Sequence, residues 1–114
     1  LIIAYSPCIA HGFDLSRQLE QQKAAVQSGH WPLYRFDPRR KASGEPALQL
    51  DSRPPSLPLK NYIYNETRYT VLAHAAPERA AMLLAEAEAD IAERWSLYER
   101  LAKPKSVVEN GAPS

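Results

Sequence analysis

The sequence is poor in the residues that hold small proteins together through disulfides or metal ions. It has a single cysteine, Cys8, among 114 residues, which excludes an internal disulfide and any metal cluster held by this chain's thiolates alone. Its four glycines include no G-x-G-x-x-G spacing of a phosphate-binding loop. No apolar run approaches the roughly 18 residues that span a bilayer, and no signal peptide is recognisable. We therefore expect a cytoplasmic protein without a membrane partner.

The chain also lacks an excess of charge of either sign. Fourteen lysines and arginines against thirteen acidic residues leave a net charge of +1, which is no footprint for nucleic acid or an anionic membrane. One local basic cluster follows an aromatic stretch and consists of Arg35, Arg39, Arg40 and Lys41. Such a cluster could receive a phosphate or an acidic partner, but a solvated rim beside a loop is the favoured interpretation.

Proline, by contrast, is abundant. The chain has ten prolines, about twice the usual share, and six of them lie between Pro32 and Pro58. Proline lacks the backbone donor that helices and central strands require. We therefore expect residues 37–61 to be an extended segment, with one brief strand at 48–51.

The N-terminal part has the pattern of strand, helix and strand. Residues 1–6 are apolar on both faces, as in a strand buried in a parallel sheet. Because the chain has no initiator methionine and residue 1 already lies in this apolar run, we expect it to start in mid-strand. Asp14 or Ser16 is suited to cap a helix running to about residue 28, with Gly29 at its end. Its inward stripe would contain Leu15, Leu19 and Val26. A second strand is expected at 30–36, which gives a βαβ-like order.

The C-terminal part is predicted to be helical. We expect one helix over 61–75 and a longer one over 77–103, with Pro77 in its first turn and Pro104 after its end. One face of the longer helix carries apolar residues at helical spacing, namely Leu84, Ala87, Ile91, Trp95 and Tyr98. The segment 104–114 is polar and rich in turn residues and is predicted to be disordered. The expected class is α/β, with one domain at most.

Cys8 is the residue best suited to act as a nucleophile or a metal ligand. It follows a predicted strand and precedes a predicted helix, where open α/β sheets bind ligands and where a thiol pKa is lowered. A small buried apolar residue is an equally good interpretation. With His11 it also has the spacing of half a zinc site, but the sequence offers no second pair of ligands. Cys8 and His11 could equally be the nucleophile and base of a hydrolase, but no orienting acid is recognisable in the sequence.

Five blocks of the sequence carry a resemblance to a known family. The blocks are Ile3-Ala4-Tyr5-Ser6-Pro7-Cys8-Ile9-Ala10-His11-Gly12, Gln21-Gln22-Lys23, Ser28-Gly29-His30-Trp31-Pro32-Leu33-Tyr34-Arg35-Phe36-Asp37-Pro38, Leu48-Gln49-Leu50-Asp51-Ser52 and Asn65-Glu66-Thr67-Arg68-Tyr69. In order from residue 1 to about 102, they resemble the C-terminal end of the pyruvate:ferredoxin (flavodoxin) oxidoreductases.

The resemblance implies a large homodimeric enzyme of which this chain is the last segment. Such enzymes decarboxylate pyruvate oxidatively on thiamine diphosphate, pass electrons through iron-sulfur clusters to ferredoxin or flavodoxin, and form acetyl-CoA. It implies that Cys8 is one of four ligands of the 4Fe-4S cluster nearest the thiamine, and that the ligands of thiamine diphosphate and Mg²⁺ lie upstream.

Residues 1–103 would then be the C-terminal part of a domain that binds thiamine diphosphate and an iron-sulfur cluster, and the isolated chain would be inactive. The alternative is a free-standing interaction module without catalysis. Its proline-rich middle and the helix bearing Trp95 and Tyr98 would dock a partner.

Overall fold

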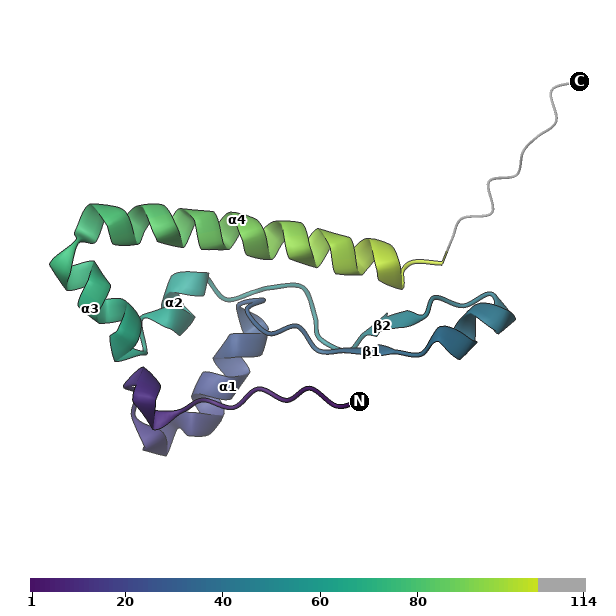
Figure 1. The fold of residues 1–114 in the computed structure, drawn as a ribbon, viewed down its shortest axis with the longest axis horizontal. Coiled ribbons are helices and arrows are strands. Elements are labelled where there is room, and N and C mark those ends of the chain that lie inside the picture. The colour runs from purple at the N-terminus through teal and green to yellow at the C-terminus, as the bar shows by residue number, and fades with distance from the viewer. Residues whose placement is uncertain (105–114) are drawn as a thin grey trace, which may run out of the picture.

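The computed structural model describes residues 1–104 as a helical assembly with one small sheet (Figure 1). In chain order the elements are η1 (Ile9–His11), η2 (Leu15–Arg17), α1 (Gln18–Gln27), β1 (Tyr34–Phe36), η3 (Pro38–Ser43), β2 (Leu48–Leu50), α2 (Leu59–Ile63), α3 (Thr67–Ala75) and α4 (Pro77–Ala102), where η marks a 3-10 helix. The predicted tail falls almost entirely at 105–114, which lies outside the described residues. No helix within 1–104 has the length and apolarity needed to cross a membrane.

Helix α4 runs along one side of the molecule, over α2, α3 and the hairpin (Figure 1). Pro77 occupies its first turn, where a missing backbone donor costs nothing, and Lys103 has extended backbone angles that end it. Of the predicted apolar face, Ile91 and Trp95 are buried, and Leu84, Ala87 and Tyr98 are half-buried. Both the range and the inward face of this helix are thus confirmed.

Helix α1 begins and ends as its sequence predicts. The Asp14 carboxylate accepts hydrogen bonds from the Ser16 backbone N–H at 3.0 Å and from its hydroxyl at 2.8 Å, which starts the 3-10 turn leading into α1. Gly29, with φ of +79°, donates its N–H to the Val26 carbonyl at 3.1 Å just beyond the helix end.

The predicted inward stripe of α1 is wrong at two of its three residues. Leu15 and Leu19 are exposed and Val26 is half-buried, whereas Gln21 and Ala25 are buried. The buried face is selected by a polar contact, because the Gln21 side-chain amide donates to the Tyr62 carbonyl at 3.3 Å and to the Glu66 carboxylate at 3.0 Å. Hydrophobic periodicity carries no signal for such a contact.

The sheet of the described residues is an antiparallel hairpin of β1 and β2. Tyr34 pairs with Leu50 and Phe36 with Leu48, so β1 occupies the end of the predicted 30–36 strand and β2 most of the predicted 48–51 strand. The predicted βαβ-like order is not found within residues 1–104, because its first strand, expected at residues 1–6, does not form there.

The predicted strand at residues 1–6 does not form within residues 1–104. Leu1, Ile2 and Ile3 are exposed, and the N-terminal arm lies apart from the hairpin (Figure 1). A strand is stable only when another strand satisfies its backbone groups, and no described segment pairs with this one. The arm is first anchored at Tyr5, which packs against the core.

The helix predicted over 61–75 is divided into α2 and α3. The Asn65 and Glu66 N–H groups donate back to Tyr62 and Ile63 and close α2. The Thr67 N–H instead leaves the helical pattern and donates to the Gly12 carbonyl at 2.8 Å. A long-range contact therefore interrupts the predicted helix.

The core is small and lies where α1, α2 and α4 meet. It contains Ala25, Leu59, Tyr62, Ile63 and Ile91. Within residues 1–104, nine apolar residues are buried, while fourteen large apolar residues are exposed. The molecule thus has more apolar surface than its own core covers.

Hydrogen exchange of the chain tests whether the N-terminal arm is unpaired while the core around α4 is protected. We expect amides of residues 2–4 to exchange at close to unfolded-chain rates, because they have no backbone partner among residues 1–104. Amides around Ile91 and Trp95 should exchange most slowly. Full, cooperative protection of residues 2–4 in the monomeric chain would contradict this arrangement.

Candidate functional site

Cys8 lies on a tight turn that we call the Cys8 turn, residues 8–12. The Cys8 carbonyl accepts the His11 N–H at 2.9 Å, and the Ile9 carbonyl accepts the Gly12 N–H at 3.0 Å. Cys8 is a free, exposed thiol that follows the buried Pro7. The interpretation of Cys8 as a small buried apolar residue is therefore wrong for residues 1–104.

The far end of the Cys8 turn is fixed to the start of α3. The Gly12 carbonyl accepts two hydrogen bonds from Thr67, one from its N–H at 2.8 Å and one from its hydroxyl at 2.7 Å. Gly12 has φ of +72°, and a Cβ at this position would lie 2.5 Å from the Thr67 Cβ. Glycine is thus required both by the left-handed backbone and by the close approach of α3.

The near end of the Cys8 turn is held by aromatic residues. The Tyr5 and Tyr62 hydroxyls share a hydrogen bond of 2.6 Å, and the Tyr5 ring packs against Trp31 with centroids 5.3 Å apart. Burial, and then the bond to Tyr5, raise the pKa of Tyr62 far above its ordinary value. The Tyr62 phenol therefore stays protonated and able to donate.

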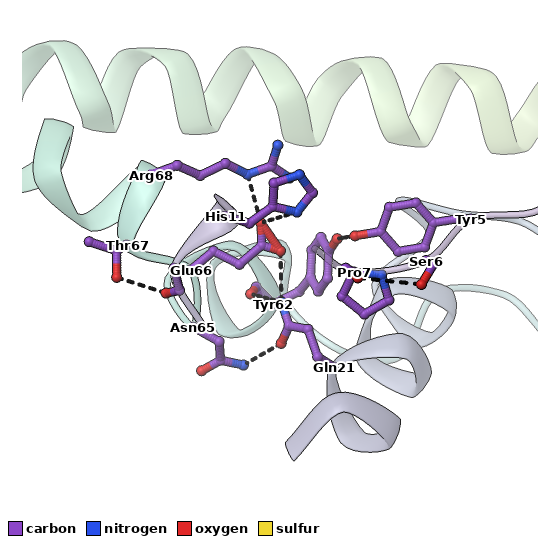
Figure 2. A network of polar contacts seen from close by, with 11 residues as sticks. Tyr5, Ser6, Pro7, His11, Gln21, Tyr62, Asn65, Glu66, Thr67 and Arg68 are labelled. Atoms are coloured by element: carbon purple, nitrogen blue, oxygen red, sulfur yellow. Dashed lines mark hydrogen bonds and ion pairs between the residues drawn. The ribbon is translucent and has the colours of Figure 1, made fainter. Parts of the chain in front are cut away.

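A buried carboxylate lies beneath the Cys8 turn. Glu66 is 0% exposed and accepts hydrogen bonds from Arg68 Nε at 2.7 Å and Gln21 Nε2 at 3.0 Å. His11 Nδ1, itself buried, lies 3.7 Å from Glu66 Oε1, within ion-pair distance. Figure 2 shows the three side chains converging on the carboxylate from the Cys8 turn, α1 and α3.

The charge of Arg68 complements that of Glu66. Partial burial opposes the charged guanidinium, but the Glu66 carboxylate together with Tyr69 and Tyr62 outweighs it, and the pKa of Arg68 is raised above its ordinary value. The guanidinium also lies 4.7 Å above the centre of the Tyr69 ring. The buried carboxylate thus has a charged partner that is itself held in place.

The other candidates from the sequence are not brought into this site. No group of three or more metal-binding side chains exists within residues 1–104, so the zinc interpretation of Cys8 and His11 gains no further ligand. For the hydrolase interpretation, the structure adds the Glu66 carboxylate, 3.7 Å from His11 Nδ1. In the basic cluster, Arg35, Arg39 and Arg40 pair with neighbouring carboxylates at 2.9, 2.9 and 3.3 Å. Lys41 is exposed. This pattern is that of the solvated rim predicted from the sequence.

The sequence did not indicate the roles of Glu66, Gln21 and Tyr62. Glu66 and Gln21 both lie in blocks that carry the family resemblance, which was the only available signal. Their partners are more than forty positions apart in the chain, so no local pattern could have joined them.

Comparisons with known proteins define the class of the chain. No family model matches it. It is 55% identical over 102 residues to a pyruvate-flavodoxin oxidoreductase of Rhodospirillum rubrum, covering 90% of this chain and 8% of that protein. A pyruvate-flavodoxin oxidoreductase of Trichormus variabilis is 52% identical over 102 residues, covering 90% and 9%. A pyruvate:ferredoxin oxidoreductase of Moorella thermoacetica is 41% identical over 103 residues, again covering 90% and 9%.

These relatives are all oxidoreductases, and the chain spans less than a tenth of their length. The chain is a homologue of the C-terminal segment of the pyruvate-flavodoxin oxidoreductases.

A pair of glycine substitutions tests the attachment of the Cys8 turn. Gly44→Ala should cost about 1–2 kcal/mol, because Gly44 is also left-handed but has open space around its Cβ position. Gly12→Ala should cost about 1–3 kcal/mol more, because the methyl group also meets Thr67. Urea denaturation of both variants measures the difference. Equal losses would show that α3 does not approach Gly12 as described.

The environment of His30 predicts a pH dependence of stability. Its ring lies 6.2 Å from that of Tyr5 and 5.0 Å from that of Tyr62. Burial first, and then the charges of Arg94 and Arg68, lower the pKa of His30 below 6.5, against an opposing effect of Glu66. The unfolded chain therefore binds this proton more readily than the folded one. The contribution of His30 to stability is present above pH 6.5 and is lost as the pH falls towards the lowered pKa.

The free energy of unfolding should therefore decrease between pH 7 and pH 5, and His30→Gln should flatten this dependence by about 1 kcal/mol or less. His74→Gln is the matched control, because His74 is exposed on α3. An unchanged slope in His30→Gln, measured by denaturation across that pH range, would contradict the burial of His30.

Proposed function

We propose that the chain forms the C-terminal segment of an enzyme that oxidatively decarboxylates pyruvate to acetyl-CoA and passes the electrons to ferredoxin or flavodoxin. The observation that carries this proposal is the 55% identity over 90% of the chain to a pyruvate-flavodoxin oxidoreductase. Thiamine diphosphate, Mg²⁺, pyruvate and coenzyme A would be bound by other parts of that cytoplasmic homodimer.

Cys8 would supply one ligand of a 4Fe-4S cluster near the thiamine. Such a cluster takes four thiolates, and the chain has one cysteine, so the other three must come from outside this sequence. The Cys8 turn suits this role, because its thiol is exposed while the neighbouring Pro7 is buried and Gly12 is clamped. When bound, the cluster would accept and release single electrons.

The apolar surface of the chain supports its packing against the rest of such a polypeptide. Leu1, Ile2 and Ile3 on the arm and Ile9 on the Cys8 turn are between 67% and 115% exposed. Covering them would bring the thiol of Cys8 into the same interface and exclude water around it. Residues 1–6 would also gain strand partners there, as expected for a segment of a thiamine-diphosphate-binding domain.

The alternative of a free-standing interaction module is not favoured by the relatives. Its proposed docking face is also occupied from within the chain. Trp95 is buried, and the Tyr98 ring packs on Tyr34 with centroids 5.2 Å apart. The contact of Tyr98 with Tyr34 thus joins α4 to the hairpin.

Cys8→Ser in the complete oxidoreductase tests the ligand assignment. We expect loss or alteration of one cluster, seen as less iron per protein and a changed electron paramagnetic resonance spectrum, with at least about tenfold slower reduction of ferredoxin, because one of four thiolates is missing. Ala10→Ser is the matched control, since it adds a hydroxyl to the same exposed turn and keeps the thiol.

The ligand assignment fails if Cys8→Ser retains the iron content, spectrum and electron transfer of the Ala10→Ser control. The chain expressed alone should show no iron-dependent absorbance, because it holds a single thiol.

A further inference from the structure

We propose that Glu66 and Thr67 are positioning residues that fix the direction of the Cys8 thiolate and thereby set the reduction potential of the cluster it binds. This inference rests on the proposed function of Cys8. Neither residue would touch the cluster; both act through the backbone of the Cys8 turn.

The side chain of Cys8 is exposed, so within residues 1–104 its direction follows from the backbone that carries it. That backbone is a single 3-10 turn, η1, without a buried residue of its own. A 3-10 turn of three residues has little stability by itself. The contacts that residues outside the turn make with it therefore decide where the thiol points.

Among the described residues, the adjacent residues Glu66 and Thr67 make two such contacts, and a further contact holds the chain just before the turn. Thr67 binds the Gly12 carbonyl through both its N–H and its hydroxyl. Glu66 faces His11 Nδ1 at 3.7 Å. On the other side, Tyr5 binds Tyr62, one turn of chain before Glu66. The Cys8 turn is thus held on one side by the Tyr5–Tyr62 pair and on the other by the residues at the start of α3.

Glu66 is suited to this task because it cannot move away. Its carboxylate is 0% exposed and is held by Arg68 on one oxygen and by Gln21 on the other. A glutamine in its place would remove the charge that pairs with Arg68 and would turn its N–H₂ group towards Arg68 or Gln21, both of which donate to Glu66. The carboxylate would then no longer be held in the position from which it faces His11.

If the Cys8 turn is displaced, the reduction potential of the bound cluster changes. The potential of an iron-sulfur cluster depends on the net charge, on hydrogen bonds to the sulfurs and on solvent exposure. Groups that contact a metal ligand orient that ligand and adjust the redox potential of the bound metal. A Cys8 turn that shifts on α3 alters the solvent exposure of the ligand sulfur without removing the ligand.

The experiment uses the complete oxidoreductase with Glu66→Gln, Thr67→Val and Thr67→Ser. The serine variant retains the hydroxyl that donates to Gly12, so it is the conservative rescue. Glu93→Gln on the exposed side of α4 is the matched control for loss of a carboxylate. The readouts are iron content, the midpoint potential of the cluster by spectroscopic redox titration, and its paramagnetic line shape.

We expect Glu66→Gln and Thr67→Val to keep their iron but to show a shifted midpoint potential and a broader signal. Thr67→Ser and Glu93→Gln should match the parent enzyme. The positioning role is overturned if all four variants titrate like the parent. If Glu66→Gln loses iron, Thr67→Val decides by the same criterion, because it leaves the buried charges intact.

The two proposals fail in distinguishable ways. If Cys8→Ser leaves every cluster unchanged, the ligand assignment itself is wrong. If Cys8→Ser removes the cluster while Glu66→Gln and Thr67→Val leave its potential unchanged, only the positioning role is wrong.

Discussion

A carboxylate cut off from water has to be surrounded by donors, because an unpaired buried charge costs several kcal/mol. Glu66 accepts hydrogen bonds from Arg68 on α3 and Gln21 on α1, and it lies 3.7 Å from His11 Nδ1 on the Cys8 turn. These groups come from three separate parts of the chain, so surrounding one charge brings all three parts together. The inward face of α1 follows from this polar centre, and the break between α2 and α3 and the placement of the exposed thiol follow from the adjacent contact of Thr67 with Gly12.

The elements that the sequence predicted correctly are those whose ends depend on local chemistry. Pro77 starts α4 because it needs no backbone donor there, and Gly29 follows α1 because it accepts a left-handed backbone. The apolar face around Ile91 and Trp95 was visible because it repeats at helical spacing over one long helix. In each case the determining residues lie within a few positions of one another.

What could not be predicted depends on partners distant in the chain. The arm at residues 1–6 has the composition of a strand, but a strand needs another strand, and residues 1–104 provide none. Gln21 and Glu66 are polar residues at buried positions, and a pattern based on hydrophobicity assigns such residues to the surface. Cys8 was proposed as a ligand through resemblance alone; the exposure of its thiol and the clamp behind it became visible only in the fold.

The central claim is that the Cys8 sulfur is bonded to iron in the complete enzyme. Replacing Cys8 alone by selenocysteine places a unique X-ray absorber at this position, because no other cysteine of the enzyme then carries selenium. X-ray absorption at the selenium edge, measured on the enzyme with its other cysteines left as sulfur, then reports directly on the neighbours of that atom. The account predicts iron scatterers at bonding distance from selenium. A spectrum with only carbon around selenium would contradict it.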